Sequence, residues 1–335
     1  MGKAFCEHCR EYVDVSLVTE KEVTEFEGMR YVYPVRYGVC QRCGGRATPD
    51  EVQAENQRSF LDAVRTENGI VSQRTIEAIP ERYNIGKRPL SKVLGWGEQS
   101  YSRFIEGDIP SREYSKTISR IDRSPLAYLL ILHTNTRALT DLAFRKSKEA
   151  AMRALTSTSS AAERAAAYIL AKTGSSSPLG LQKELYYANG LCEAFLGRPL
   201  VSERCEAWTR GPVYPRLWET LELRSVREES MFGQEVAEAV GKTFSPEERE
   251  VLEAVISRIA CYSPFALQDF THREAPWREA RTDVPDGEPS TNEISEESVR
   301  RFFHALKERY RMQKPADIGE YMQDMVKDLQ GSRIP

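Results

Sequence analysis

Two closely spaced cysteine pairs near the N-terminus constrain the fold of this chain more than any other feature. The first pair is Cys6 and Cys9, and the second is Cys40 and Cys43. Zinc takes four ligands in a tetrahedron, and two cysteines separated by two residues converge on one ion from a tight turn. Two glycines follow the second pair and give its turn backbone freedom. The spacing therefore predicts a structural Zn²⁺ site with four cysteine ligands and no open position for catalysis.

Other interpretations of these cysteines stay open at this stage. Redox-active pairs have the same spacing, although they usually begin a helix that follows a strand, and neither pair has that setting. His8 is a possible substitute ligand. The three remaining cysteines, Cys192, Cys205 and Cys261, are scattered, and we expect them to be small residues of the core.

Between the cysteine pairs the sequence alternates between apolar and polar residues. Residues 12–18 and 29–37 show this two-residue period, and residues 25–29 form a turn candidate. The pattern predicts a β-hairpin clamped at its base by the metal. A domain of about 50 residues has a small core, so metal binding should supply much of the folding free energy of residues 1–50.

The pattern becomes helical after Pro49, and residues 51–125 are predicted to form a helix-turn-helix domain. A short helix ends at Gly95, a tight turn follows, and a second short helix ends at Gly107. The apolar residues expected to be buried are Leu90, Val93 and Leu94 in the first helix and Tyr101, Phe104 and Ile105 in the second. In this motif the second helix enters the DNA major groove.

Polar residues of this segment match the chemistry of DNA recognition. Gln99 and Arg103 lie four residues apart on one helix face, and their side chains can bond adenine and guanine bidentately. The predicted base-reading residues are Gln99, Ser100, Ser102 and Arg103, and the predicted phosphate contacts are Lys87, Arg88, Ser91 and Lys92. A plain helical hairpin with solvated charges is the alternative interpretation.

The charge distribution supports a local site for a polyanion. The formal net charge of the chain is −3. Residues 71–160, however, carry 15 basic and 9 acidic side chains, while both flanks are acidic. A basic segment inside an acidic chain is typical of a local polyanion-binding module; ordinary fluctuation of charge along the chain is the alternative.

The cysteine-clamped hairpin followed by the segment from Leu94 to Gly107, with its Gly-Trp-Gly turn, resembles the MqsA-type antitoxins over about residues 1–125. The resemblance implies that Gln99 and Arg103 read bases, although the family more often has Asn at the first position. It also implies a homodimer that binds a palindromic double-stranded operator and represses its own operon. Helices that follow the reading unit hold the dimer in that family, so residues 126–160 are the expected dimer contact.

The second half of the chain is predicted to be mainly helical with a small sheet. Residues 126–160 form a helical connector, with helices at 126–132 and 137–155 and a polar linker at 156–160. Residues 161–312 form a further domain and 313–335 a C-terminal helix or tail. Within that domain we expect helices at 161–172, from Ser177, at 212–223, after a capping box at Ser245, at 263–270 and at 295–311, with a strand at 200–208 and a surface loop at 283–291. The fold class is thus mainly α.

Three blocks of this half resemble the Panacea domain, also described as SocA/GepA-like. The blocks are Leu179–Ala188, Glu206–Pro215 and Ala275–Trp277. Glu184 stands where the family commonly has lysine. Panacea domains act as antitoxins that bind varied toxins directly, and SocA serves as a protease adaptor, so the resemblance implies a cognate toxin as partner.

Each block also has a structural interpretation. Tyr186, Tyr187 and Trp208 are expected to be core aromatics, and Gly211–Val213 a turn that leads into a helix. Alternatively, Arg210, Tyr214 and Trp218 are exposed anchors of a toxin interface, because arginine, tyrosine and tryptophan are enriched at interface hot spots.

No catalytic motif is present in the sequence. Its four histidines show no HExxH spacing, and no P-loop, GxSxG or GxGxxG sequence occurs, so we expect no enzyme. The sequence also lacks an apolar leader and an apolar run of ~20 residues, which predicts a cytoplasmic protein without a membrane span. The prediction is a toxin-neutralising antitoxin and autorepressor; the alternatives are a zinc-containing regulator without a toxin and a proteolytic adaptor for a toxin.

Overall fold

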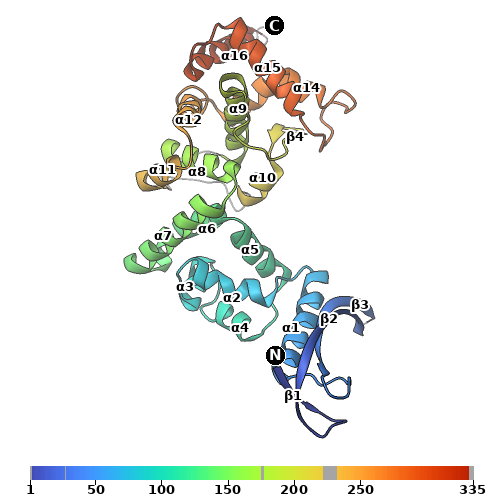
Figure 1. Ribbon diagram of the computed structural model, residues 1–335. Coiled ribbons are helices and arrows are strands. Elements are labelled where there is room, and N and C mark those ends of the chain that lie inside the picture. The colour runs from blue at the N-terminus through green and yellow to red at the C-terminus, as the bar shows by residue number, and fades with distance from the viewer. Residues whose placement is uncertain (1, 27, 175–176, 222–231, 332–335) are drawn as a thin grey trace. The chain divides into compact units, whose positions relative to one another are not determined.

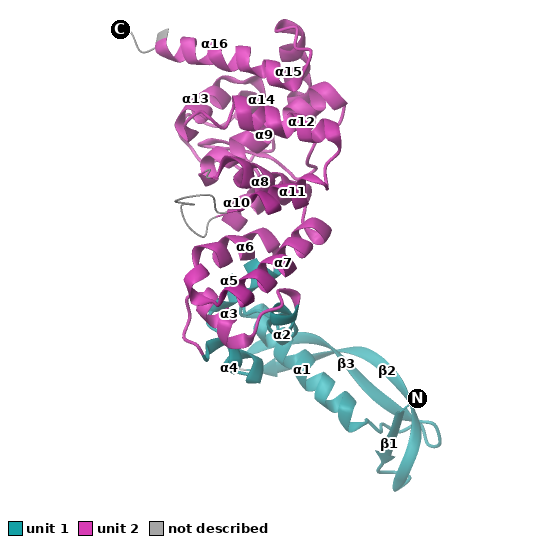
Figure 2. Ribbon diagram, turned by 90° about the vertical axis from the view of Figure 1, so that its left-hand side faces the viewer, with its two compact units in different colours: residues 1–81, 99–122 teal, residues 82–98, 123–335 magenta. Residues whose placement is uncertain are grey.

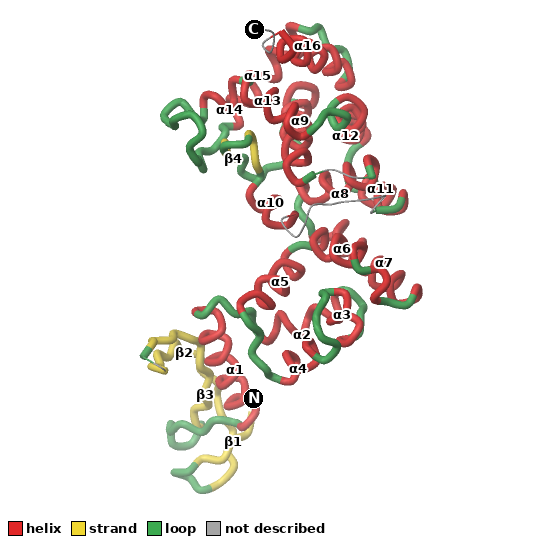
Figure 3. Tube along the Cα trace, turned by 180° about the vertical axis from the view of Figure 1, so that it is seen from behind, coloured by secondary structure: helices red, strands yellow, loops and turns green. Residues whose placement is uncertain are grey.

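The computed structural model describes residues 2–26, 28–174, 177–221 and 232–331. It contains two compact units, formed by residues 1–81 with 99–122 and by residues 82–98 with 123–335 (Figure 2). Helices dominate, and strands occur at the N-terminus and in one short hairpin (Figure 3). The predicted fold class is therefore confirmed, whereas the predicted domain boundaries stay predictions.

The first unit begins with a three-stranded antiparallel sheet of β1 (Gly2–Cys6), β2 (Glu11–Phe26) and β3 (Met29–Cys40), in that order (Figure 1). The predicted hairpin is confirmed, and its strands are longer than the alternating segments. The turn candidate at 25–29 includes residue 27, which lies outside the described residues, and the strands that flank it pair Phe26 with Met29. β1 was not predicted, because five residues are too few to show a period.

Helix α1 (Asp50–Glu67) packs against β3. Tyr31, Tyr33 and Val35 of the strand form a small core with Phe60, Ala63 and Val64 of the helix. The side chain of Asn56 accepts a hydrogen bond from the Arg36 amide and donates one to the Arg36 carbonyl. Successive strand residues alternate between faces, so α1 covers the face of β3 opposite to Cys40.

Three further helices complete the first unit: α2 (Gln73–Arg82), α4 (Ser100–Glu106) and α5 (Arg112–Arg123). The Tyr101 hydroxyl donates to the carbonyl of Ile76 at 2.9 Å. The side-chain amide of Gln73 donates to the backbone carbonyls of Phe104 and Ile105. These contacts join the two ends of α4 to α2.

The second unit starts with α3 (Lys87–Val93), α6 (Pro125–Thr134), the 3₁₀ helix η1 (Thr136–Ala138) and α7 (Asp141–Thr158). α7 runs through most of the predicted linker at 156–160. The hydroxyls of Thr156, Ser157 and Thr158 donate to carbonyls one turn back, which allows a polar run to continue a helix. Only Ser159 and Ser160 separate α7 from α8 (Ala161–Thr173).

Helix α9 (Pro178–Leu196) is the centre of the second unit and is buried along most of its length. It contacts α8, α10 (Pro215–Leu221), α12 (Pro246–Arg258), α13 (Pro264–Arg273) and α15 (Glu296–Arg309). The remaining elements are α11 (Gln234–Gly241), α14 (Ala275–Glu279), η2 (Pro315–Asp317) and α16 (Ile318–Gly331). The predicted helix starts at Ser177, Ser245 and Ser263 are confirmed, since each serine accepts a hydrogen bond from a first-turn amide.

A short hairpin of β4 (Glu206–Trp208) and β5 (Gly211–Val213) interrupts the helices. The predicted strand at 200–208 is shorter than expected. The predicted helix at 212–223 begins only at Pro215, because residues 211–213 pair with β4; its last two residues lie outside the described part of the chain. The prediction of a turn at Gly211–Val213 was therefore wrong.

Several expectations about burial can now be compared with the structure. Tyr186, Tyr187, Cys192 and Cys205 are buried, as predicted, whereas Cys261 is exposed and is not a core residue. The loop at 283–291 lies on the surface, as expected. Across the described residues, no helix combines the length and the apolar character needed to cross a membrane.

Candidate functional site

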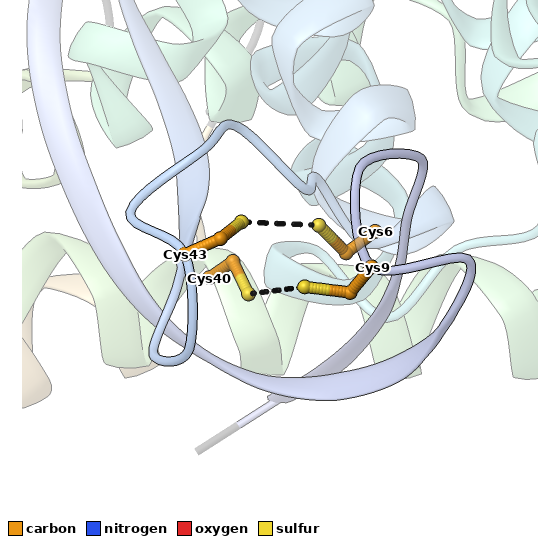
Figure 4. Close-up of side chains that lie close together, drawn as sticks. All are labelled: Cys6, Cys9, Cys40 and Cys43. Carbon is orange, nitrogen blue, oxygen red and sulfur yellow. Dashed lines mark hydrogen bonds between the residues drawn. The ribbon is translucent and has the colours of Figure 1, made fainter.

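The four N-terminal cysteines meet at one end of the sheet (Figure 4). All four sulfur atoms lie within 4.8 Å of one another. The Sγ atoms of Cys6 and Cys43 are 3.6 Å apart, and those of Cys9 and Cys40 are 3.9 Å apart. A tetrahedron with metal–sulfur bonds of ~2.3 Å has sulfur–sulfur edges of about 3.8 Å. The donor set therefore fits a four-coordinate metal ion.

The two cysteine turns have the same backbone design. Arg10 donates its amide to the carbonyl of Cys6 at 2.7 Å, and Gly44 donates its amide to the carbonyl of Cys40 at 2.9 Å. Both residues have positive φ, 56° at Arg10 and 72° at Gly44. Each turn thus closes four residues after its first cysteine and directs two sulfurs to the same point.

Backbone amides in the second turn point at sulfur. The amide of Arg42 donates to Cys40 Sγ and that of Gly45 donates to Cys43 Sγ, each at 3.4 Å. Amides of Cys43 and Arg42 lower the pKa of Cys40 to about 7, whereas the neighbouring Cys43 and burial raise the pKa of Cys9 to about 12. Thiolates this close together repel one another, which opposes deprotonation of several of them at once. A bound divalent cation would offset that repulsion.

His8 is not part of this donor group. The group that could hold a metal among the described residues consists of the four cysteines alone, and His8 is exposed on the first turn. The structure thus favours four thiolate ligands over the alternative with a histidine.

The predicted reading segment contains the expected elements. α3 ends at Val93, Gly95 follows with φ of 73°, and α4 ends at Gly107, a left-handed C-cap. Gln99 and Arg103 are exposed, and the Arg103 amide donates to the Gln99 carbonyl at 3.0 Å. Because α3 and α4 belong to different compact units, the helix-turn-helix arrangement of the two stays a prediction.

Two of the predicted DNA contacts are buried. Ser100 is 7% exposed and does not face outward as expected, because it lies four residues before the buried Phe104 on the same helix face. Ser91 is fully buried, and its hydroxyl donates to the carbonyl of Lys87. The side chains of both serines are therefore withdrawn from the surface.

The other predicted contacts are accessible to different degrees. Lys87 and Arg88 are exposed, and Ser102 is half-buried. Lys92 is also exposed but pairs with Glu98 at 2.8 Å, and this contact lowers the pKa of Glu98. Among the predicted phosphate contacts, Lys87 and Arg88 are thus the most available.

In the second unit, side chains from distant parts of the sequence hold the backbone of the β4–β5 hairpin. We name Gln182, Lys183, His272, Trp277 and Arg281 the hairpin clamp. Lys183 Nζ donates to the backbone carbonyl of Pro212 at 3.1 Å. The side-chain oxygen Oε1 of Gln182 accepts from the backbone amide of Tyr214 at 2.8 Å. Both side chains are fully buried on α9.

The rest of the hairpin clamp acts on β4 and on the turn. Trp277 Nε1 donates to the carbonyl of Trp208, and Arg281 donates to the carbonyl of Ala207, each at 2.9 Å. His272 hydrogen-bonds to the backbone of Thr209 and stacks on Trp277 with ring centroids 4.0 Å apart. The hairpin clamp therefore holds backbone groups before, within and after the turn of the hairpin.

Gly211 is required where the hairpin rests on α9. Its φ is +100°, and a Cβ atom there would lie 2.8 Å from Lys183 Cε and 2.8 Å from Thr271 Oγ1. Any larger residue would push the strand away from α9 and α13. The glycine therefore permits the close approach on which the hairpin clamp depends.

Lys183 and Glu274 are buried, titratable groups of this core. Burial lowers the pKa of Lys183 to about 7 and raises the pKa of Glu274 to about 7. Glu274 Oε1 accepts hydrogen bonds from the hydroxyls of Tyr187 and Tyr321, each at 2.7 Å, and these bonds oppose part of the burial effect. The carboxyl group joins α9 to α16 through these tyrosines.

The predicted toxin-contact residues differ in their placement. Arg210 is exposed at the tip of the hairpin. Trp218 is half-buried and packs edge-on against Trp208 at 5.8 Å between ring centroids. Tyr214 is only 1% exposed, so its prediction as a surface anchor was wrong; it lies directly after β5, where its amide is bound by Gln182.

Residues 181–278 match the family described as antitoxin SocA-like, Panacea domain. No curated protein and no solved structure matches the chain. The C-terminal part thus carries a SocA-like Panacea domain, as the resemblance implied. The matched segment begins one residue before Gln182 and ends one residue after Trp277, so it covers most of the hairpin clamp and the entire hairpin.

The three sequence blocks that carry the resemblance meet at this hairpin. The first supplies Gln182 and Lys183, the second is the hairpin itself, and the third supplies Trp277. Sequence analysis missed the roles of Gln182, Lys183 and Arg281. A signal for the first two was present, because Gln182 and Lys183 belong, with Glu184, to a polar run between Leu181 and Leu185.

Proposed function

We propose that this chain is the antitoxin of a type II toxin–antitoxin system, neutralising a cognate toxin by direct contact rather than by catalysis. The observation that carries the proposal is the Panacea-domain match over residues 181–278. The rigidly held hairpin within that segment is a structural feature suited to presenting side chains to a partner. The chain is proposed to act in the cytoplasm.

Co-expression with the product of the adjacent gene tests this function. Cells that express the neighbour alone should stop growing, and cells that also express this chain should grow. The two proteins should copurify. A harmless neighbour would instead favour a zinc-containing regulator without a toxin. Loss of the toxin in a pulse-chase experiment would favour a proteolytic adaptor.

We further propose that the first half binds operator DNA as a homodimer and represses the chain's own operon, with Zn²⁺ as a structural ion at the four cysteines. The exposed Gln99 at the N-cap of α4, the exposed Arg103 within α4, the left-handed Gly107 cap and the local basic charge support this role. The half-sites of a palindromic operator would then lie ~34–36 Å apart.

Replacement of Arg103 by alanine tests the base-reading role. A bidentate contact to guanine is worth ~1–3 kcal/mol, so Arg103→Ala should weaken operator binding about 5- to 150-fold in a gel-shift titration. Toxin rescue by the same variant should be unchanged. Arg58→Ala on α1 is the control, since this exposed arginine lies outside the predicted reading segment. Unchanged operator affinity of Arg103→Ala would remove Arg103 from the proposed interface.

A further inference from the structure

The tip of the β4–β5 hairpin carries an arginine that forms no ion pair among the described residues. Arg210 is exposed, and no carboxylate pairs with it in the part of the chain that the structure describes. Arg204, just before the same hairpin, differs because it pairs with Glu206 at 3.4 Å and with Glu293 at 3.5 Å. Arg210 is thus available to a partner, whereas Arg204 serves the fold.

The backbone that carries Arg210 is fixed before any partner arrives. The hairpin clamp binds Ala207, Trp208, Thr209, Pro212 and Tyr214, which are the residues on both sides of the tip. Binding costs less when the contact residues are already ordered. Preorganisation of an exposed arginine by five side chains from two parts of the chain points to a recognition role for the tip.

Aromatic surface accompanies the arginine. Trp208 and Trp218 pack edge-on and are both half-buried, and Trp208 Nε1 donates to Glu206 Oε2 at 2.7 Å. Tryptophan and arginine are the residues most enriched at interface hot spots. The hairpin therefore offers a partner the exposed Arg210 together with two half-buried tryptophan side chains.

The charges beside the tip favour a protein over a nucleic acid. The Thr209 hydroxyl donates to the carbonyl of Glu288 at 3.3 Å, which places the loop at 283–291 next to the tip. Asp283, Asp286 and Glu288 of this loop are exposed. A phosphate backbone would be repelled by them, while a protein surface can offer one carboxylate to Arg210 and avoid the acidic loop.

We propose that the β4–β5 hairpin tip is the toxin-docking element, with Arg210 pairing to a carboxylate of the toxin and Trp218 packing beside it. This assignment rests on the proposed antitoxin function. It makes the hairpin clamp a positioning device for Arg210.

The test measures binding of the full-length chain to the purified product of the adjacent gene. Arg210→Glu should weaken that binding by at least about 30-fold, the usual size of a hot-spot effect. Arg249→Glu on α12 makes the same charge change on an exposed arginine away from the hairpin, and it should stay within about twofold of the wild type. Gly211→Ala, which displaces the hairpin from Lys183, should also weaken binding, with folding checked by circular dichroism.

The outcomes separate the inference from the function on which it rests. If the wild-type chain binds and rescues, while Arg210→Glu does so equally well, the hairpin tip is not the docking element and the antitoxin function stands. If Arg210→Glu instead weakens operator binding and leaves toxin binding unchanged, the tip contacts nucleic acid and the proposal is overturned. A wild-type chain that neither binds nor rescues contradicts the proposed function itself.

Discussion

The buried lysine of the hairpin clamp allows a quantitative prediction about stability and pH. Burial lowers the pKa of Lys183 from 10.5 to about 7, which corresponds to about 5 kcal/mol at ~1.4 kcal/mol per pKa unit. Between these pH values the unfolded chain binds a proton that the folded chain does not. The folded state is therefore free of the cost of burying a charged Lys183 above pH 10.5. It loses stability progressively as the pH falls from 10.5, and the loss is complete once the pH has fallen through 7.

Lys183→Met removes this dependence while conserving most of the side-chain volume. The unfolding free energy of the wild type should rise relative to that of Lys183→Met by about 1.4 kcal/mol per pH unit above pH 7. At pH 7 the variant should be more stable by a few kcal/mol, reduced by about 1–3 kcal/mol because the Pro212 carbonyl loses its donor.

Urea unfolding followed by tryptophan fluorescence measures this effect selectively. All four tryptophans, Trp96, Trp208, Trp218 and Trp277, belong to the second compact unit. Measurements from pH 7 to 9.5 on the wild type, Lys183→Met and the control Lys242→Met, an exposed lysine of the same unit, give the difference in slope. Parallel pH profiles for the wild type and Lys183→Met would refute the assignment of a buried, largely neutral lysine.

Three further predictions follow from the same structure. Burial raises the pKa of Glu274 to about 7. The stability that the protonated carboxyl contributes is therefore present below its unfolded-state pKa near 4.5 and is lost as the pH rises to 7. Glu274→Gln should lack this loss of about 3 kcal/mol in urea titrations from pH 4.5 to 7. The wild type should bind one Zn²⁺ per chain by atomic absorption, and Cys40→Ser should lower both the metal content and the protease resistance of residues 1–50, whereas Cys261→Ser should change neither. Arg10→Gly should keep the metal and raise thermal stability by up to about 1 kcal/mol, because Arg10 has the positive φ that Gly44 has in the second turn; a destabilised Arg10→Gly variant would contradict the equivalence of the two turns.

Features that depend on a few neighbouring residues were predictable from the sequence. The cysteine spacing, the glycine ends of α3 and α4 and the serine caps of α9, α12 and α13 all act within one turn of the chain. The alternating pattern likewise predicted the β2–β3 hairpin, although β1 was too short to detect. Helix existence was thus more predictable than the ends of β4 and α10, where pairing between strands decided the outcome.

Two of the wrong predictions have a cause that lies beyond the local sequence. Tyr214 is an amphipathic residue whose burial depends on which element packs over it. Cys261 is exposed for the same reason, since nothing in its neighbourhood in sequence reveals that no other element covers it. The error at 156–160 has a local cause instead: the polar run was expected to be a linker, yet its hydroxyls bond to the preceding turn and extend α7.

The amino-acid sequence by itself determined which four cysteines cluster, the mainly helical class and the match to a Panacea-type segment, because residue type and spacing carry that information. Only the tertiary structure revealed that Gln182, Trp277 and Arg281, about 100 residues apart at the extremes, bind one short hairpin. Contacts between distant segments depend on how helices pack together, and packing direction is not encoded in any single stretch of the chain. The exposure of Arg210 on a fixed turn is a property of that packing.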